Sequence, residues 1–446
     1  MSNIDKTNSL SEILSSKYFP FLLCLFLMFL HFISAYPGGM SSDTFDQYSQ
    51  SISGNYYSHH PPLMSMLWSV LHYIYQGPQT MLFIHLALLW GGVLLLFYAN
   101  PQNKYKYLYF VIPLLSNILS QSATIWKDVA FSLGSFFIFA TCVFYTYHKK
   151  PAPLLIIIGL LLLCFYIASV KFQAKYIAPI LIFFIISIYL NINVVLRLII
   201  TTVISILIIF ANESIINRYS INTHSEQLRQ LFDVAGVSFT IDNDDLIPQY
   251  IKDNDALYSF EKLKKYYSCE LVNPLVFHDN RIYDSTLDPA NLQQMEAAYI
   301  QAYSKHPIIF LKNRAKIFNV LMNRGKECEY AFIAENDAQQ NNFPLQQNYF
   351  KQLVTKYLKL YPNIMAINLV SFILIFVYLT HIIAHRRSRA TEITILNYVV
   401  VLSLTFSLVI FFATMAADYR YYYVVRVLTL FSLPIYFKSI TNNRRL

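Results

Sequence analysis

Long apolar runs separated by short polar loops constrain this chain more than any other feature. A run of about 20 apolar residues can cross a bilayer as a helix, which satisfies its backbone polar groups internally. We predict ten such spans, at 19–36, 79–98, 107–122, 128–147, 152–170, 175–191, 195–212, 364–383, 394–416 and 422–437. Only 13% of the residues are charged, about half the share of a soluble domain. The predicted fold class is an all-α polytopic membrane protein.

Basic residues in the connecting loops predict the orientation of these spans, since cytoplasmic loops are enriched in Lys and Arg. With both termini in the cytoplasm, the cytoplasmic loops and tail contain Lys104, Lys106, Lys149, Lys150, Arg197, Arg386, Arg387, Arg389, Arg444 and Arg445. The opposite loops contain only isolated basic residues. The net charge of +9 therefore reflects topology, and no nucleic-acid partner is expected.

The chain divides into three predicted regions. Residues 1–212 form an N-terminal transmembrane module whose first outer loop is 37–78, residues 213–363 form a small, mainly helical outer domain, and residues 364–446 contain the last spans. The apolar stretch 63–76 is too short to cross and is expected to lie on the membrane as an interfacial helix.

The first outer loop holds the most reactive set of side chains. Asp43 and Asp46 are three residues apart, so on a helix they would share one face, within reach of one metal ion or proton donor. The alternative is a solvated loop in which these acids cap a helix. His59 and His60 are either ligands of the same ion or ordinary polar loop residues.

Further charged residues fall at span ends on the same side. Lys127 would bind a phosphate or extend its amine to the interface, and Asp128 would bind a cation or cap a helix. The other members are Lys171, Gln173, Lys175, Asp418, Arg420 and Tyr421. Their common side predicts a polar cavity open away from the cytoplasm.

The five cysteines divide by environment. Cys24, Cys142 and Cys164 lie in apolar runs and are expected to be small buried hydrophobes. Cys269 and Cys328 lie in the polar region, where a disulfide is expected outside the cytoplasm and two free thiols are the alternative.

Two segments resemble those of a known family. The segment YYSHHPPL at 56–63 is similar to a motif of the GT-C membrane glycosyltransferases, which include protein O-mannosyltransferases and aminoarabinose transferases. The segment DYRY at 418–421 is similar to the ending of bacterial members. The resemblance implies that Asp43 is the catalytic base and that the donor is a sugar on a polyprenyl phosphate. Thr44 replaces the usual second acid, so Asp46 is expected to supply that carboxylate.

The expected function is sugar transfer to a cell-envelope glycan, lipid or protein, lipopolysaccharide included, at the periplasmic face of a bacterial inner membrane. Lys127 and Arg420 would stabilise the leaving phosphate, and His59, His60, Lys171, Gln173 and Tyr421 would line the substrate site. A divalent cation held by Asp46 or Asp128 is the one cofactor suggested. No nucleotide is needed because the sugar arrives on lipid.

Two other functions stay open. A glycan polymerase or ligase would use the same lipid carrier. A secondary transporter or flippase of lipid-linked sugars should carry charges near the middle of several spans. The predicted spans are nearly free of charge there, which favours an enzyme.

Overall fold

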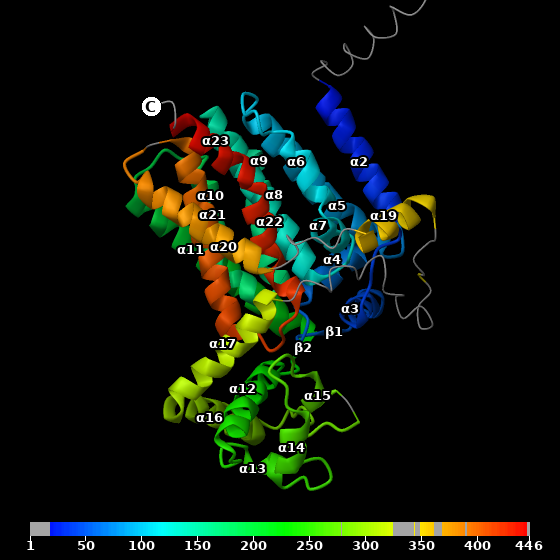
Figure 1. Cartoon of the computed structure of the whole chain (residues 1–446). Helices are drawn as coiled ribbons and strands as arrows, with labels where there is room; N and C mark the ends of the chain where they lie inside the picture. The colour runs from blue at the N-terminus through cyan, green and yellow to red at the C-terminus, as the bar shows by residue number, and fades with distance from the viewer. Residues whose placement is uncertain are drawn as a thin grey trace, which may run out of the picture.

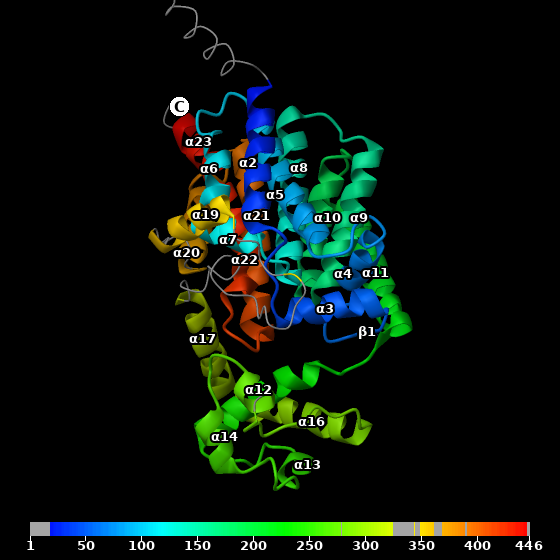
Figure 2. The same ribbon diagram turned by 90° about the vertical axis from the view of Figure 1, so that its right-hand side faces the viewer.

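The chain, taken as a computed structural model, is mainly helical in the part that the structure describes (Figure 1). The structure describes residues 18–277, 279–323, 343, 348–360, 368–388 and 390–443. The long helices run side by side as one bundle, and a separate group of shorter helices lies beyond one end (Figures 1 and 2). We call this end of the bundle the domain end. The opposite end, where the first helix begins and the last one finishes, is the far end (Figure 1).

The bundle is built from the predicted apolar runs. Its helices are α2 (Phe19–Ala35), α5 (Gln79–Ala99), α8 (Lys127–His148), α9 (Leu154–Val170), α10 (Ala178–Ser187), α11 (Val194–Tyr219), α20 (Asn368–Ala384), α21 (Thr391–Ala413), α22 (Tyr423–Phe431) and α23 (Leu433–Asn443). Within the described residues, five segments are long and apolar enough to cross a membrane: Gln79–Ala99, Lys127–His148, Val194–Tyr219, Thr391–Ala413 and Tyr419–Asn442. The prediction of an all-α chain with helices of membrane-crossing length is confirmed.

The predicted span at 107–122 is not one helix. It consists of α6 (Leu108–Val111), the 3-10 turn η1 (Ile112–Leu114) and α7 (Ser116–Ser122). Pro113 lacks an amide hydrogen and its ring clashes with the preceding turn, which interrupts a helix. Leu115 is extended, with φ −60° and ψ 134°, and turns the chain into α7. The prediction of a single helix here is therefore wrong.

Apolar side chains cover much of the outside of the bundle. On α11, which lies at its edge, Leu198, Ile206 and Phe210 are exposed. Leu155 and Leu162 on α9 are exposed in the same way. A soluble helix would turn such a face inward, so this surface is suited to lipid.

The predicted first loop, residues 37–78, folds into α3 (Ser42–Ser53) and α4 (Leu63–Leu71), and α4 is too short to cross a bilayer. Between them, the short strand β1 (Tyr56–Tyr57) pairs in parallel with β2 (Ser220–Ile221), directly after α11. This pairing joins the first loop to the start of the polar region.

The helices beyond the domain end form what we call the helical domain, residues 222–323. It contains α12 (Glu226–Ile241), α13 (Gln249–Lys252), α14 (Phe260–Tyr266), α15 (Asn273–Val276), α16 (Pro289–Lys305) and α17 (Pro307–Asn323). From the sequence, this domain was predicted to extend to residue 363. In the structure, however, α19 (Tyr349–Leu360) lies beside α2 (Figure 1). There, Asn348 donates to the carbonyl of Ile33 at 2.9 Å.

The structure tests the predictions for the buried cysteines but not the predicted disulfide. Cys24, Cys142 and Cys164 are buried and have free thiols, which confirms the expectation for the apolar runs. Cys269 is half-buried and has no disulfide partner among the described residues. Cys328 lies outside the described residues, so its pairing with Cys269 stays a prediction.

Close packing between α8 and α9 gives a test of the fold. A Cβ on Gly134 of α8 would overlap the branched side chain of Ile167, whereas a Cβ on Gly159 of α9 would meet nothing within 4 Å. Overpacking a helix contact costs about 1–3 kcal/mol. We expect Gly134→Ala to lower the melting temperature of the protein in detergent and Gly159→Ala to leave it unchanged or raised. Equal melting temperatures for the two variants would contradict the packing of α8 on α9.

Candidate functional site

The backbone before α3 is fixed against the segment that leads into α8. Gly39 donates to the carbonyl of Ala123 at 2.9 Å, and Ile125 donates back to Gly39 at 2.8 Å. Gly38 has a φ of +119°, and a Cβ there would lie 2.6 Å from Cδ1 of Ile125. Only glycine suits both that dihedral and that space. The start of α3 is therefore held next to the start of α8.

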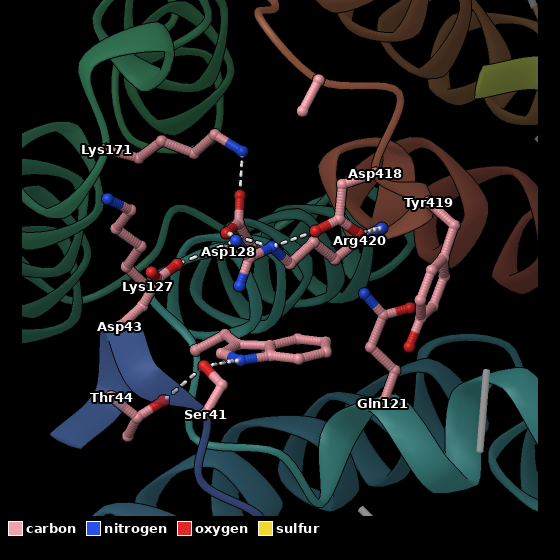
Figure 3. Close-up of polar contacts among 12 residues, drawn as sticks. Ser41, Asp43, Thr44, Gln121, Lys127, Asp128, Lys171, Asp418, Tyr419 and Arg420 are labelled. Carbon is pink, nitrogen blue, oxygen red and sulfur yellow. Dashed lines mark hydrogen bonds and ion pairs between the residues drawn. The ribbon is translucent and has the colours of Figure 1, made fainter. Parts of the chain in front are cut away.

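Two side-chain hydrogen bonds then set the rotation of α3. Thr44 Oγ1 donates to the carbonyl of Ile125 at 2.8 Å, and Trp126 Nε1 donates to Ser41 Oγ at 2.8 Å (Figure 3). Thr44 is fully buried. Successive helix residues are about 100° apart around the axis, so burying Thr44 also fixes the direction of the neighbouring Asp43.

Arg420 lies at the centre of the site. Its Nη2 donates to Asp43 Oδ2 at 2.8 Å, although 377 positions separate the two residues. Its Nε lies 2.7 Å from Asp418 Oδ2 and 3.8 Å from Asp128 Oδ2 as ion pairs (Figure 3). The guanidinium also lies 4.9 Å from the centre of the Trp126 ring, a favourable cation–π contact.

Asp128 is held by cations at both oxygens. Lys171, at the end of α9, pairs with its Oδ1, and Arg420 faces its Oδ2. Both members of the Lys171 pair are at most 4% exposed. Lys171 also lies 4.9 Å from the ring centre of Tyr421. Asp128 thus pairs with two cations. This arrangement does not suit its predicted role as a metal ligand, because both of its oxygens already face positive charges.

We call six residues the charge cluster: Asp43, Lys127, Asp128, Lys171, Asp418 and Arg420. Its three acids and three bases balance formally. An anion that entered the cluster would therefore compete with carboxylates for the cations.

A second polar group lies beside the charge cluster and is linked to it by Lys127. Lys127 Nζ lies 2.6 Å from His60 Nδ1. His59 Nε2 lies 2.9 Å from Asp46 Oδ2, and His60 Nε2 lies 3.8 Å from the same oxygen. Gln50 also donates to this oxygen, at 2.6 Å. We call Asp46, His59 and His60 the histidine group.

The histidine group has the composition of a metal site, since its three ligand atoms all lie within 4.8 Å of one another. Lys127 argues against a preformed one. An ammonium can only donate, so His60 Nδ1 accepts and the ring proton lies on Nε2, facing Asp46. His60 would have to change tautomer before Nε2 could bind a metal ion.

The surroundings set the protonation of both groups. Burial by itself raises the pKa of Asp43, but the attraction of Arg420 and Lys127 outweighs it and lowers that pKa. Burial also opposes ionisation of Asp46, and its hydrogen bond to His59 lowers its pKa. Burial, followed by the positive charge of Lys127, holds the pKa of His60 well below its usual value. At neutral pH both acids are ionised and His60 is neutral.

The predicted residues do not all meet. Asp43 and Asp46 both lie on α3, but Asp43 faces Arg420 while Asp46 faces the histidines. The two carboxylates are therefore not directed at one metal ion or proton donor. Gln173 lies in the turn η2 (Phe172–Tyr176), half-buried, and its side chain has no hydrogen bond or ion pair with another described residue. Its place in the substrate site stays a prediction.

Some residues of the site were not predicted. Trp126 stacks on Arg420. In the sequence, only its position directly before Lys127 and Asp128 indicated that it belongs to the site. Arg426 is fully buried in α22 and donates to Gln121 Oε1 at 2.6 Å. No pattern in the sequence indicates that α22 and α7 meet at this pair.

The lowered pKa of His60 predicts a dependence of stability on pH. Between that pKa and the usual value of about 6.5, the unfolded chain binds a proton at His60 that the folded protein excludes. This contribution to stability is full above about pH 6.5 and is lost as the pH falls below it. We expect the melting temperature of the wild type to drop between about pH 7.5 and 5.5, and His60→Gln to reduce the drop. His224→Gln, in the helical domain, should keep the wild-type slope; a His60→Gln slope equal to the wild type would refute the assignment.

Comparisons of the chain with protein-family models, curated proteins and solved structures returned no match. The resemblance to GT-C glycosyltransferases therefore rests on the motif residues alone.

Proposed function

We propose that the chain is a membrane glycosyltransferase that moves a sugar from a polyprenyl phosphate to a cell-envelope acceptor. One observation carries this proposal: Asp43 of the first outer loop and Arg420 of the last form an ion pair at 2.8 Å within the charge cluster. The reaction needs a carboxylate for the acceptor hydroxyl and cations for the leaving phosphate. Both kinds of group lie together here.

The proposed reaction is a displacement at the anomeric carbon of the donor sugar. The acceptor hydroxyl oxygen forms a bond to that carbon while the bond from carbon to phosphate oxygen breaks. The hydroxyl proton passes to Asp43, and the polyprenyl phosphate leaves with the bonding electrons. Arg420 and Lys127 stabilise the negative charge that develops on the phosphate oxygen.

The pairing of Asp43 with Arg420 fits an order of events. Arg420 lowers the pKa of Asp43, which makes this carboxylate a weak base while the pair is intact. A donor phosphate would compete for Arg420 and weaken the pair, so the pKa of Asp43 would rise when the donor is bound. Donor binding would then prepare the base for the acceptor.

We further propose that the site faces the periplasm across a bacterial inner membrane, in a chain that crosses it ten times. The charge cluster lies at the domain end, and the loop with Lys149 and Lys150 follows the opposite end of α8. The broken segment α6–η1–α7 would make one of the crossings, because Ile112 and Pro113 at the break and all of α7 are buried within the protein.

A divalent cation is proposed only for the histidine group, because the oxygens of Asp128 already face Lys171 and Arg420. Such an ion would add positive charge beside Lys127. Nucleotide chemistry forms no part of the proposal, because a lipid-linked sugar is already activated.

A transporter or flippase of lipid-linked sugars is the second candidate. It is favoured by Arg426, which is fully buried within the membrane-length segment Tyr419–Asn442, since charges at such depth often mark transport pathways. Arg426 hydrogen-bonds Gln121 and the carbonyl of Tyr419, which gives it a structural role as well. A glycan polymerase or ligase would share the chemistry proposed here and differ in its acceptor.

Removal of the proposed base is the direct test of the enzyme. Loss of general base catalysis costs about 10²- to 10⁴-fold in rate, so Asp43→Asn should abolish the product. Cell-envelope glycans would be compared by mass spectrometry in cells with the wild type, without the protein and with each variant. Asp255→Asn, an exposed acid of the helical domain, should behave as the wild type. Normal product from a folded, inserted Asp43→Asn protein would remove the mechanism.

The orientation has its own test. A reporter fused after Lys150 should be active only in the cytoplasmic form, and one inserted at Asp255 only in the exported form. The reason is that loops rich in Lys and Arg stay in the cytoplasm. The reversed pattern would place the charge cluster on the cytoplasmic side and overturn the proposed topology.

A further inference from the structure

The loop that leads to Arg420 is attached to the helical domain. We call residues 414–418 the arginine loop. Leu271 and Ala416 form an antiparallel bridge, with Val272 donating to Met415 at 3.1 Å and Ala417 donating to Glu270 at 2.6 Å. The domain therefore pairs with this loop as a short strand would.

A buried arginine of the domain reaches the same loop. Arg314 of α17 is fully buried, and its Nη1 donates to the carbonyl of Thr414. Its Nη2 pairs with Asp233 of α12, which is 3% exposed. A buried charge held by a carboxylate on one side and a carbonyl on the other has little freedom to move.

The arginine loop runs directly into the charge cluster. Thr414 also hydrogen-bonds the carbonyl of Ala416 within the loop, at 2.5 Å. Asp418 then accepts from the amide of Arg420 at 3.1 Å and pairs with its side chain. The contacts with the domain thus fix residues 414–417, and Arg420 is the third residue beyond them.

Strand β2 and the first residues of the domain hold Ser58, the residue before the histidines, through similar hydrogen bonds. Ser58 donates its amide to Ile221 at 2.9 Å and its hydroxyl to Asn222 at 3.1 Å. The amide of Thr223 donates back to Ser58 Oγ at 2.9 Å. His59 and His60 follow Ser58 immediately. Both halves of the candidate site are therefore tied to the start and the interior of one domain.

We propose that the helical domain is a positioning element of the site, and that Arg314 is the positioning residue that sets Arg420 for an anionic phosphate. The chemical class of ligand, a lipid phosphate, rests on the function proposed above. The positioning itself rests only on the hydrogen bonds between the domain and the arginine loop. The two can therefore be tested separately.

The test compares two variants that differ at one residue. Asp233→Asn removes the carboxylate charge and leaves the bond from Arg314 to Thr414. The double variant Asp233→Asn/Arg314→Met also removes that bond, without leaving an unpaired buried charge. Lys262→Gln, which loses bonds to two carbonyls inside the domain, controls for general loosening of the domain.

The first measurement is hydrogen exchange of the full-length protein in detergent. Because the arginine loop would open locally, we expect its amides, in a peptide spanning 414–422, to exchange about tenfold faster in the double variant. Lys262→Gln should match the wild type there, and Asp233→Asn, which leaves Arg314 buried without its carboxylate but still bonded to Thr414, should exchange more slowly than the double variant. Unchanged exchange in the double variant, or an equal increase in Asp233→Asn, would overturn the role of Arg314.

The second measurement is binding of a polyprenyl monophosphate in mixed micelles. We expect the dissociation constant to rise about tenfold in the double variant, about the loss of one charge-assisted hydrogen bond, and to stay within about twofold in Asp233→Asn. Equal affinity in the double variant and the wild type would overturn the link between loop and ligand. Faster exchange in the double variant, together with no binding of polyprenyl phosphate by the wild type, would leave the positioning intact and contradict the proposed function.

Discussion

The contact between the Arg420 guanidinium and three carboxylates is the interaction on which the site depends. Its side chain is only 14% exposed, and a charge so placed is costly unless it is paired. The carboxylates come from α3, from α8 and from the loop before η4 (Tyr419–Tyr422). Satisfying this one cation therefore draws together the two ends of the chain and its central helix.

The same contact also determines how the site would respond to a ligand anion. In the resting arrangement Arg420 and Lys171 already have carboxylate partners, and Asp43 is ionised but engaged. A ligand anion would redistribute these pairs, and the free energy of doing so is small because one charge-assisted contact replaces another. The link through Lys127 extends this response to His60 and the histidine group.

Much of this could be anticipated from the residues alone. Apolar runs predicted the helices, because lipid permits only backbones that bond internally, and the charges at span ends on one side predicted the members of the charge cluster. Pro113 carried the signal for the break at 107–122, and the prediction gave it too little weight. The predicted helical domain was extended to residue 363 because α19 is polar enough to read as part of it, yet α19 packs beside α2.

The pairings were decided only in the folded chain. That Asp43 faces Arg420 while Asp46 faces His59 depends on the rotation of α3, which hydrogen bonds from Thr44 and Trp126 set across 80 or more positions. The attachment of the arginine loop to the domain depends on backbone hydrogen bonds. Because such bonds do not require particular side chains, the residue types do not predict them. Composition and order dictate which groups sit near the membrane face; long-range contacts, invisible in local patterns, dictate which of them touch.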